Sequence, residues 1–317
     1  MRLPLRAVVD VIRGEGLASA LRRTRERLTR AERFDDRDVE IINVCADITP
    51  RSGGVAIQLL HRLHDEHALR KMRVTTRLPS PDTAVHIESA HGFDFAEIVR
   101  FKKFVISVHD FTLIASREVL EAATGVIFPS EFLRDAYGVA GEIVEPCLPH
   151  VEIGTGGTNI AFAGNVKRHK GGHLLPEIAR SLDVPFHVFG SGDVDLLRAL
   201  RRVPNVVVHG YYRHGTLPSL LARYDIGRVV LPSIVPESYS LVLTECWQAG
   251  AAVAAFDIGA IAARIRQHGG GWLTPLESGA QGLVALLRLP NVAVPQVPRS
   301  NAAAQHVALY RKWGLLS

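Results

Sequence analysis

Cysteine is scarce in this chain, and the few cysteines present form no recognisable pattern. The 317 residues include three cysteines, Cys45, Cys147 and Cys246, which lie far apart in the sequence. Their spacing matches neither a zinc site nor a redox motif, and an odd number does not favour a set of disulfides. Free cysteines of this kind fit a reducing compartment, so we expect a cytoplasmic protein without a structural metal ion.

Long uncharged apolar runs are also missing. A membrane-spanning helix needs about twenty consecutive apolar residues, but the Ala-rich stretch 241–263 is interrupted by Glu245, Gln248 and Asp257. No uncharged segment with a small-residue cleavage site opens the chain, so a secretory signal peptide is not expected. A hydrophobic content of 47% with 22% charged residues is ordinary for a globular protein, and the length favours two domains.

Acidic residues are outnumbered mainly in the first 33 residues. This leader contains nine arginines and four acidic residues, and its net charge of +5 equals that of the whole chain. Its pattern predicts two helices separated by Gly14-Glu15-Gly16, the second with Leu17, Leu21 and Leu28 on one face. Such a helix could lie on an anionic membrane surface, or pack on its own domain or on a partner chain. Nucleic acid is not an expected partner, because the remaining residues carry no basic excess.

From residue 39 the chain alternates between apolar strands and helices in two rounds, which is typical of doubly wound α/β layers. In the first round, a glycine loop precedes a helix that carries Val55 and Leu59, and Ser130 is a plausible N-cap for another. The predicted strands are 39–45, 84–87, 104–108 and 125–128, then 159–163, 186–189, 206–209, 226–231 and 251–256; the predicted helices of the second round are 171–182, 217–224 and one beginning near 241.

A turn-rich stretch, Gly154-Thr155-Gly156-Gly157-Thr158, separates the two rounds and is the expected interdomain linker. We therefore expect a basic helical leader over 1–37, an N-terminal Rossmann-like domain over 38–153, and a C-terminal Rossmann-like domain over 154–317. A return of the last helix to the N-terminal domain is compatible with this division. Ligands of two such domains normally bind outside the carboxyl ends of the strands.

Two glutamates separated by seven residues follow the strand 226–231. Glu237 lies in a loop and Glu245 lies one turn inside the next helix, so the two carboxylates can reach different hydroxyl groups. The backbone N–H groups of Ser240, Leu241 and Val242 open this helix. Together with the helix dipole, these groups favour the binding of a diphosphate.

The stretch from Val230 to Gly250 resembles the nucleotide-sugar site of glycosyltransferase family 4, which has the GT-B fold. The family continues with a strand, an Asp-x-Gly turn and a Gly-Trp/Leu-Leu stretch, and 253–256, 257–259 and 271–273 take those places here. The resemblance implies that Glu237 contacts the donor sugar and Glu245 the ribose. It also implies donor contacts from Tyr239, Ser240 and Leu241.

The start of the second domain resembles the same family. Lys170, followed by a glycine, matches the family lysine that holds the diphosphate, and a compact ammonium suits that role. Asn165 stands where the family usually has an arginine, and Ser240 where it usually has a glycine. Arg168 and Lys167 are the candidates to supply the missing charge. We include Asn165 and Arg168 among the donor-binding residues.

The first domain resembles the family more loosely. Gly53 and Gly54 match a glycine loop that approaches the donor phosphates, an approach that glycine permits. His109 ends the strand 104–108 and matches a histidine that faces the reacting centre in many members. His109 and Glu237 are therefore the catalytic candidates.

The alternation of strands and helices predicts an α/β protein. The resemblance implies a GT-B-like fold, in which two doubly wound Rossmann-like domains face a cleft, the first (38–153) on the acceptor side and the second (154–317) binding the nucleotide sugar. Family membership implies a retaining, metal-independent transfer from a nucleoside-diphosphate sugar to a saccharide or lipid-linked acceptor, in bacterial surface polysaccharide or glycoconjugate synthesis. No cofactor and no metal are expected beyond the donor. The protein is expected in the cytoplasm, with peripheral attachment at the inner face of the plasma membrane left open, as is the oligomeric state. The alternative is a non-catalytic glycosyltransferase-like subunit that binds nucleotide sugar or serves as a scaffold.

Overall fold

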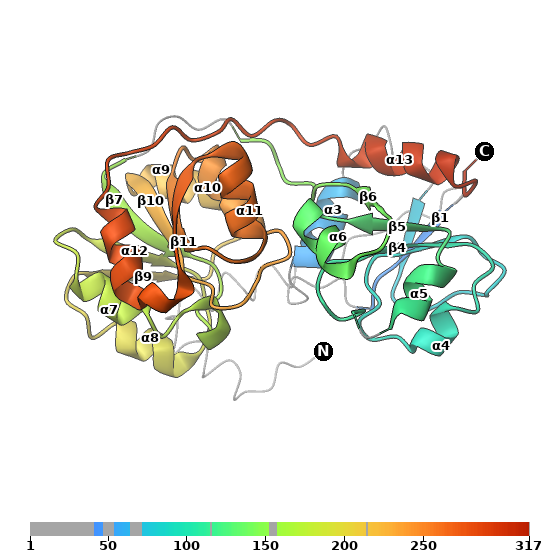
Figure 1. Cartoon of the computed structure of the whole chain (residues 1–317), viewed down its shortest axis with the longest axis horizontal. Helices are drawn as coiled ribbons and strands as arrows, with labels where there is room; N and C mark the ends of the chain where they lie inside the picture. Colours follow the sequence, from blue (N-terminus) through green and yellow to red (C-terminus); the bar gives the residue numbers. More distant parts are fainter. Residues whose placement is uncertain are drawn as a thin grey trace. The chain divides into compact units, whose positions relative to one another are not determined.

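The computed structural model describes residues 41–46, 54–63, 72–114, 116–151, 157–213 and 215–316. The predicted leader, Gly53 and most of the predicted linker lie outside these residues. The chain divides into two compact units between Pro149 and His150, four residues before the expected boundary. We call 150–298 the C-terminal unit, and the described residues up to Pro149 together with those from Arg299 to Leu316 the N-terminal unit (Figure 1).

The N-terminal unit contains a six-stranded parallel sheet in the order β2-β1-β3-β4-β5-β6. The strands are β1 (Ile41–Val44), β2 (Met72–Thr75), β3 (Val85–Ile87), β4 (Phe104–Ser107), β5 (Gly125–Phe128) and β6 (Glu142–Ile143). The helices are α3 (Gly54–Leu63), α4 (Phe95–Ile98), α5 (Arg117–Ala122), α6 (Glu131–Tyr137) and α13 (Ala302–Lys312). Ser130 caps α6, since its hydroxyl accepts from the Leu133 N–H at 3.2 Å.

The last helix, α13, completes the core of the N-terminal unit. Tyr310 and Leu315 are buried in one cluster with Ile41, Val105 and Ile127, which come from β1, β4 and β5. The final residues of the described chain are therefore part of the first sheet's packing, although they follow the entire C-terminal unit in sequence.

The C-terminal unit contains a second six-stranded parallel sheet, in the order β12-β11-β10-β7-β8-β9. Its strands are β7 (Asn159–Ala163), β8 (Phe186–Phe189), β9 (Val206–Gly210), β10 (Ile226–Leu231), β11 (Ala252–Phe256) and β12 (Gly271–Thr274). Its α-helices are α7 (Leu175–Arg180), α8 (Val194–Leu200), α9 (Leu217–Arg223), α10 (Leu241–Gln248), α11 (Gly259–His268) and α12 (Gly279–Leu287), with 3-10 turns η1 (Arg168–Lys170) and η2 (Leu276–Ser278).

Helices cover both faces of the second sheet, and the alternation of side chains along β7 explains how. Ile160 and Phe162 pack in one cluster with residues of α7, α8 and α12, whereas Ala161 and Ala163 pack in another with residues of α9, α10 and α11. Successive strand residues point to opposite faces. A strand buried on both faces reads as a continuous apolar run, as these strands do.

The predicted fold class is confirmed, with differences of detail. The helix expected over 171–182 is limited to α7, because Gly171 adopts a left-handed φ of +73° that is not helical and ends the preceding 3-10 turn η1. Strands β2, β6 and β12 were not predicted as strands; β6 has only two residues. Among the described residues, no helix is both long and apolar enough to span a membrane.

Candidate functional site

The first part of the candidate site forms where β7 and β10 end. These parallel strands are neighbours, so the residues that follow them emerge at the same edge of the sheet. The loop after β10 is tied to η1 by a bond from the Ile234 N–H to the His169 carbonyl at 3.0 Å. The Lys170 ammonium and the Glu237 carboxylate, 67 positions apart in sequence, consequently form an ion pair.

Two glycines allow the backbone to come this close. At Gly171 a Cβ would collide with the carbonyl oxygen of Pro232, and the left-handed φ also favours glycine. Gly259, with a φ of +69°, lies so close to the glutamate loop that a Cβ would stand 2.6 Å from the Glu237 nitrogen. The Ala260 N–H also donates to the Glu237 carbonyl at 2.9 Å. The Asp-x-Gly turn therefore supports the backbone of Glu237.

The second part of the site is the beginning of α10. Ser240 is its N-cap, and the Ser240 hydroxyl accepts from the Leu243 N–H at 3.4 Å. Ser240 has a φ of +71°, which is rare for a residue other than glycine. Leu241 begins the helix. The ring of Tyr239 is buried against the Arg264 guanidinium, so the Tyr239 side chain is part of the packing below this loop.

Glu245 is almost completely buried, with 1% of its surface exposed. One carboxylate oxygen, Oε1, accepts from the Gly215 N–H at 3.0 Å, while Oε2 has no partner among the described residues. Burial raises the pKa of Glu245 to about 7, against a smaller lowering by the Gly215 hydrogen bond. A buried acceptor without a partner calls for a donor such as a ligand hydroxyl.

The remaining predicted donor residues lie at the start of the C-terminal unit. Asn165 is exposed just after β7, and its carbonyl accepts from the Lys167 N–H at 2.9 Å. Arg168 is exposed at the first position of η1, two residues before Lys170. This turn gathers the cationic side chains of Lys167, Arg168 and Lys170 near the end of β7. Such a group of positive charges favours an anion.

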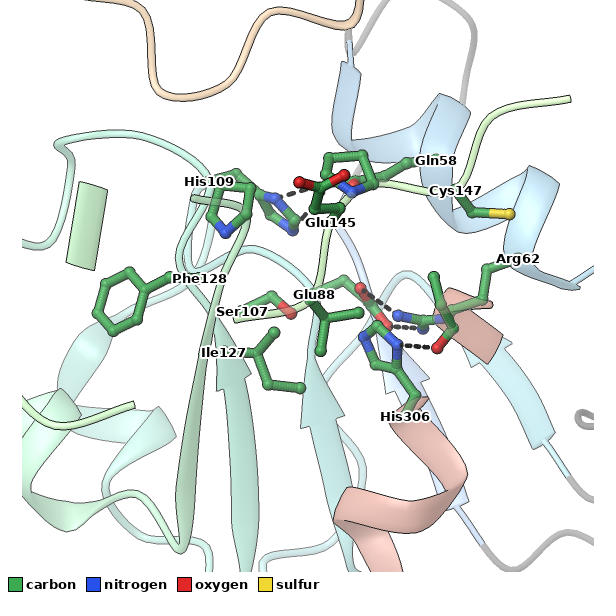
Figure 2. A pocket seen from close by; sticks show the side chains of 14 residues that line it. Gln58, Arg62, Glu88, Ser107, His109, Ile127, Phe128, Glu145, Cys147 and His306 are labelled. Atoms are coloured by element: carbon green, nitrogen blue, oxygen red, sulfur yellow. Dashed lines mark hydrogen bonds and ion pairs between the residues drawn. The ribbon is translucent and has the colours of Figure 1, made fainter. Parts of the chain in front are cut away.

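In the N-terminal unit, His109 borders a small pocket (Figure 2). The His109 Nδ1 atom lies 2.8 Å from the Gln58 Nε2 atom, and Gln58 belongs to α3, which begins at the predicted Gly54. Burial lowers the pKa of His109, an effect partly opposed by the charges of Glu88 and Asp110, so the ring is neutral near pH 7. The pocket has a volume of about 20 Å³, enough for a water molecule.

A buried polar network lies at the other end of this pocket (Figure 2). Arg62 of α3 forms an ion pair with Glu88, which follows β3, and donates to Asn43 Oδ1 at 3.0 Å. His86 Nδ1 lies 2.5 Å from the hydroxyl of Tyr310 on α13. The network thus connects two strands, α3 and α13, and it explains how polar groups can be buried beneath His109.

No motif in the sequence pointed to Gln58, Glu88, Gly215 or Arg264. A sequence signal existed for two of them: Glu88 directly follows the apolar strand β3, and Gln58 lies about one helical turn after Gly54. Gly215 and Arg264 act through contacts with segments 24 to 30 residues away, for which the sequence contains no local signal.

Comparison with known proteins supports the identity of the C-terminal unit. Residues 157–289 match the family model "Glycosyl transferases group 1", whereas a comparison with curated proteins found no match. HepE of Anabaena in complex with UDP-glucose aligns with a TM-score of 0.60 and 15% identity, covering 86% of this chain and 99% of that chain. Sucrose-phosphate synthase of Thermosynechococcus elongatus aligns with a TM-score of 0.58 and 17% identity, covering 85% and 81%.

These identities are low, so the structural likenesses bear on the fold, and the family model carries the functional inference. The second sheet has the strand order of a Rossmann fold, and the described strands of the first have a doubly wound order like that of flavodoxin. The range matched by the family model contains both glutamates, Lys170 and α10. Residues 157–289 form a glycosyl transferases group 1 domain, and the chain is accordingly a glycosyltransferase with the GT-B fold.

Proposed function

We propose that the C-terminal unit binds a nucleoside-diphosphate sugar and that the enzyme transfers the sugar to a saccharide or lipid-linked acceptor with retention of configuration. One observation carries the proposal: Lys170 and Glu237 are paired beside the start of α10, and Glu245 offers an unpartnered oxygen within the same helix. A cation, a helix N-terminus and a carboxylate are the groups that a diphosphate and a ribose require.

The ion pair suggests how the donor is received. Lys170 would exchange Glu237 for the diphosphate, and Glu237 would then be free to accept from a hydroxyl of the donor sugar. Glu245 would accept from the ribose. The electrostatic contribution to catalysis would come from Lys170 and the amides of α10, which stabilise the negative charge of the departing diphosphate.

His109 would serve the sugar from the N-terminal unit. As a neutral, half-buried imidazole it can exchange a hydrogen bond with a hydroxyl without the cost of desolvating a charge. We propose that His109 and Glu237 each orient the sugar through hydrogen bonds to its hydroxyl groups. Their contribution is then positioning rather than covalent catalysis.

The finer parts of the proposal are metal independence and a role in bacterial surface polysaccharide or glycoconjugate synthesis. The structure named lipopolysaccharide outer core galactosyltransferase WaaB aligns with a TM-score of 0.58 at 11% identity, covering 87% of this chain and 100% of that chain. This likeness makes a glycoconjugate acceptor a reasonable choice for assays. Nucleic acid is not proposed as a partner.

Titration calorimetry with UDP, GDP, ADP and dTDP, followed by transfer assays with the matching sugar nucleotides, tests the proposal. We expect one nucleoside diphosphate to bind and its sugar derivative to be hydrolysed or transferred. Binding without turnover on any acceptor would favour the non-catalytic subunit instead, and Asn165 in place of an arginine is the feature that would suit it. Absence of binding by all four diphosphates would contradict both.

A further inference from the structure

Arg264 of α11 is buried beneath the loop that leads into α10. Only 7% of its surface is exposed, although arginine is rarely buried to this extent. Its Nη1 atom donates to the carbonyl oxygens of both Tyr239 and Ser240, each at 3.1 Å. A single side chain thus holds two consecutive carbonyls immediately before the first helical residue.

The other half of the guanidinium fixes the same loop to the body of α10. The Nη2 atom donates to the Tyr239 hydroxyl at 3.1 Å and to Thr244 Oγ1 at 2.9 Å. The guanidinium carbon also lies 3.9 Å from the centre of the Tyr239 ring and 5.1 Å from that of Trp247. Planar stacking and a fixed fork of donors are properties that arginine has and lysine lacks.

These contacts determine where two amide groups point. In a trans peptide the N–H is directed opposite to the carbonyl of the preceding residue. When Arg264 holds the Tyr239 carbonyl, it therefore directs the Ser240 N–H away from itself, and its hold on the Ser240 carbonyl does the same for the Leu241 N–H. These are the first amides of the α10 N-terminus, where the proposed function places the diphosphate.

Ser240 also needs such support, because its φ of +71° is unfavourable for a residue with a Cβ. Conformations of this kind are strained and persist only where the surroundings impose them. The Ser240 hydroxyl caps α10 on one side, and Arg264 holds the Ser240 carbonyl on the other. Packing alone would not require arginine at position 264, because an apolar side chain could fill the same space without the cost of desolvating a charge.

We propose that Arg264 is a positioning residue for the donor diphosphate: it holds the carbonyls of Tyr239 and Ser240 so that the amides of Ser240 and Leu241 are directed at the phosphates. The proposal rests on the proposed function, because it presumes that a nucleoside diphosphate binds here. It adds a residue that does not touch the ligand and acts through the backbone of the loop.

The test compares the affinity for the nucleoside diphosphate that the wild-type protein binds with the affinity for the corresponding nucleoside, which lacks phosphates. We expect Arg264→Gln to weaken diphosphate binding at least tenfold and nucleoside binding less than twofold, in calorimetry on folded protein. Arg264→Lys, which keeps the charge but loses the fork, should show a smaller loss of the same kind. Arg266→Gln is the matched control, since Arg266 lies on the same helix, is largely exposed and pairs with Asp257.

A second variant separates positioning from general stability. Glycine adopts positive φ without penalty, so adding Ser240→Gly to Arg264→Gln should recover part of the lost diphosphate affinity. Equal losses for nucleoside and diphosphate in both Arg264 variants, with no recovery by Ser240→Gly, would overturn the proposal while leaving the proposed function intact. Failure of the wild-type protein to bind any of the four diphosphates would instead contradict the proposed function, and this inference with it.

Discussion

At the scale of single residues, the ion pair between Lys170 and Glu237 defines the first prediction. Replacing Lys170 with alanine removes the cation proposed for the diphosphate, and we expect binding to weaken by about 1.5–3 kcal/mol, the range for a hydrogen bond to a charged group. Calorimetry measures the difference. Lys102→Ala is the control, because Lys102 pairs with Asp82 on an exposed surface of the N-terminal unit. Unchanged diphosphate affinity in Lys170→Ala would refute the assignment.

Glu245 predicts a pH dependence of nucleotide binding. Its pKa of about 7 means that the carboxyl group becomes protonated as the pH falls below neutrality, and only the carboxylate can accept from two ribose hydroxyls. We expect affinity to fall between pH 8 and pH 6, by up to about tenfold per unit below the pKa. In Glu245→Gln this fall in affinity should disappear, and the only remaining pH dependence should come from the titration of the ligand's own phosphate. Parallel pH profiles for the two proteins would contradict the prediction.

The raised pKa of Glu245 affects the stability of the fold in the opposite direction from its effect on nucleotide affinity. Because the folded pKa lies above the ordinary value of 4.5, the folded protein holds a proton between pH 4.5 and 7 that the unfolded chain releases. The contribution of Glu245 to the free energy of unfolding therefore falls as the pH rises through this window. A buried carboxylate kept for function at the expense of stability is common at binding sites.

At the scale of elements, the contact between the start of α11 and the glutamate loop is the feature to test. In Gly259→Ala the added methyl group must displace the backbone of Pro236 and Glu237. We expect turnover to fall by about 10- to 100-fold, since a displacement of about 1 Å at a catalytic group can have this effect. Steady-state kinetics on the folded variant provides the measurement.

Gly269→Ala is the matched control for this element. Gly269 lies at the other end of α11 and also has a positive φ, but a Cβ there would meet nothing within 4 Å. Both variants carry backbone strain, so both should melt at lower temperature, and only Gly259→Ala should lose turnover. Equal turnover in the two variants would show that the contact with Glu237 does not matter for catalysis.

At the scale of the whole molecule, metal independence is the first expectation. The proposed donor site uses Lys170 and helix amides in place of a metal ion to balance the diphosphate charge. Transfer should therefore survive dialysis against EDTA. Loss of activity that Mn²⁺ or Mg²⁺ restores would show that a metal is required.

The basic leader provides the second expectation at this scale. If residues 1–33 bind an anionic surface, the full-length protein should sediment with anionic vesicles, and added salt should weaken the association because exposed charges are screened over about 8 Å at physiological ionic strength. Removing these residues should abolish sedimentation and leave nucleotide binding unchanged. A truncated protein that melts at lower temperature, together with full-length protein that ignores vesicles, would favour packing of the leader on protein.

Much of the architecture could be predicted because each round of strands is locally encoded. Apolar runs such as 125–128 and 159–163 coincide with β5 and β7, and α6 begins after its predicted cap at Ser130. The short edge pairing of β6 and the interruption at Gly171 escaped prediction. Both depend on neighbouring segments rather than on periodicity.

The two α/β rounds, the glutamate spacing and the candidate cation could be recognised without a structure, because strand and helix periods and short motifs are local properties. The pairing of Lys170 with Glu237, the burial of a Glu245 oxygen that has no partner among the described residues, and the support of Ser240 by Arg264 became visible in the folded chain alone. The folded chain also shows that α13 joins the first sheet after the second unit is complete. Each of these features depends on a contact between segments that are distant in sequence. Such contacts follow from the order of the strands in the sheet and from the packing of the helices, and no local sequence pattern encodes them.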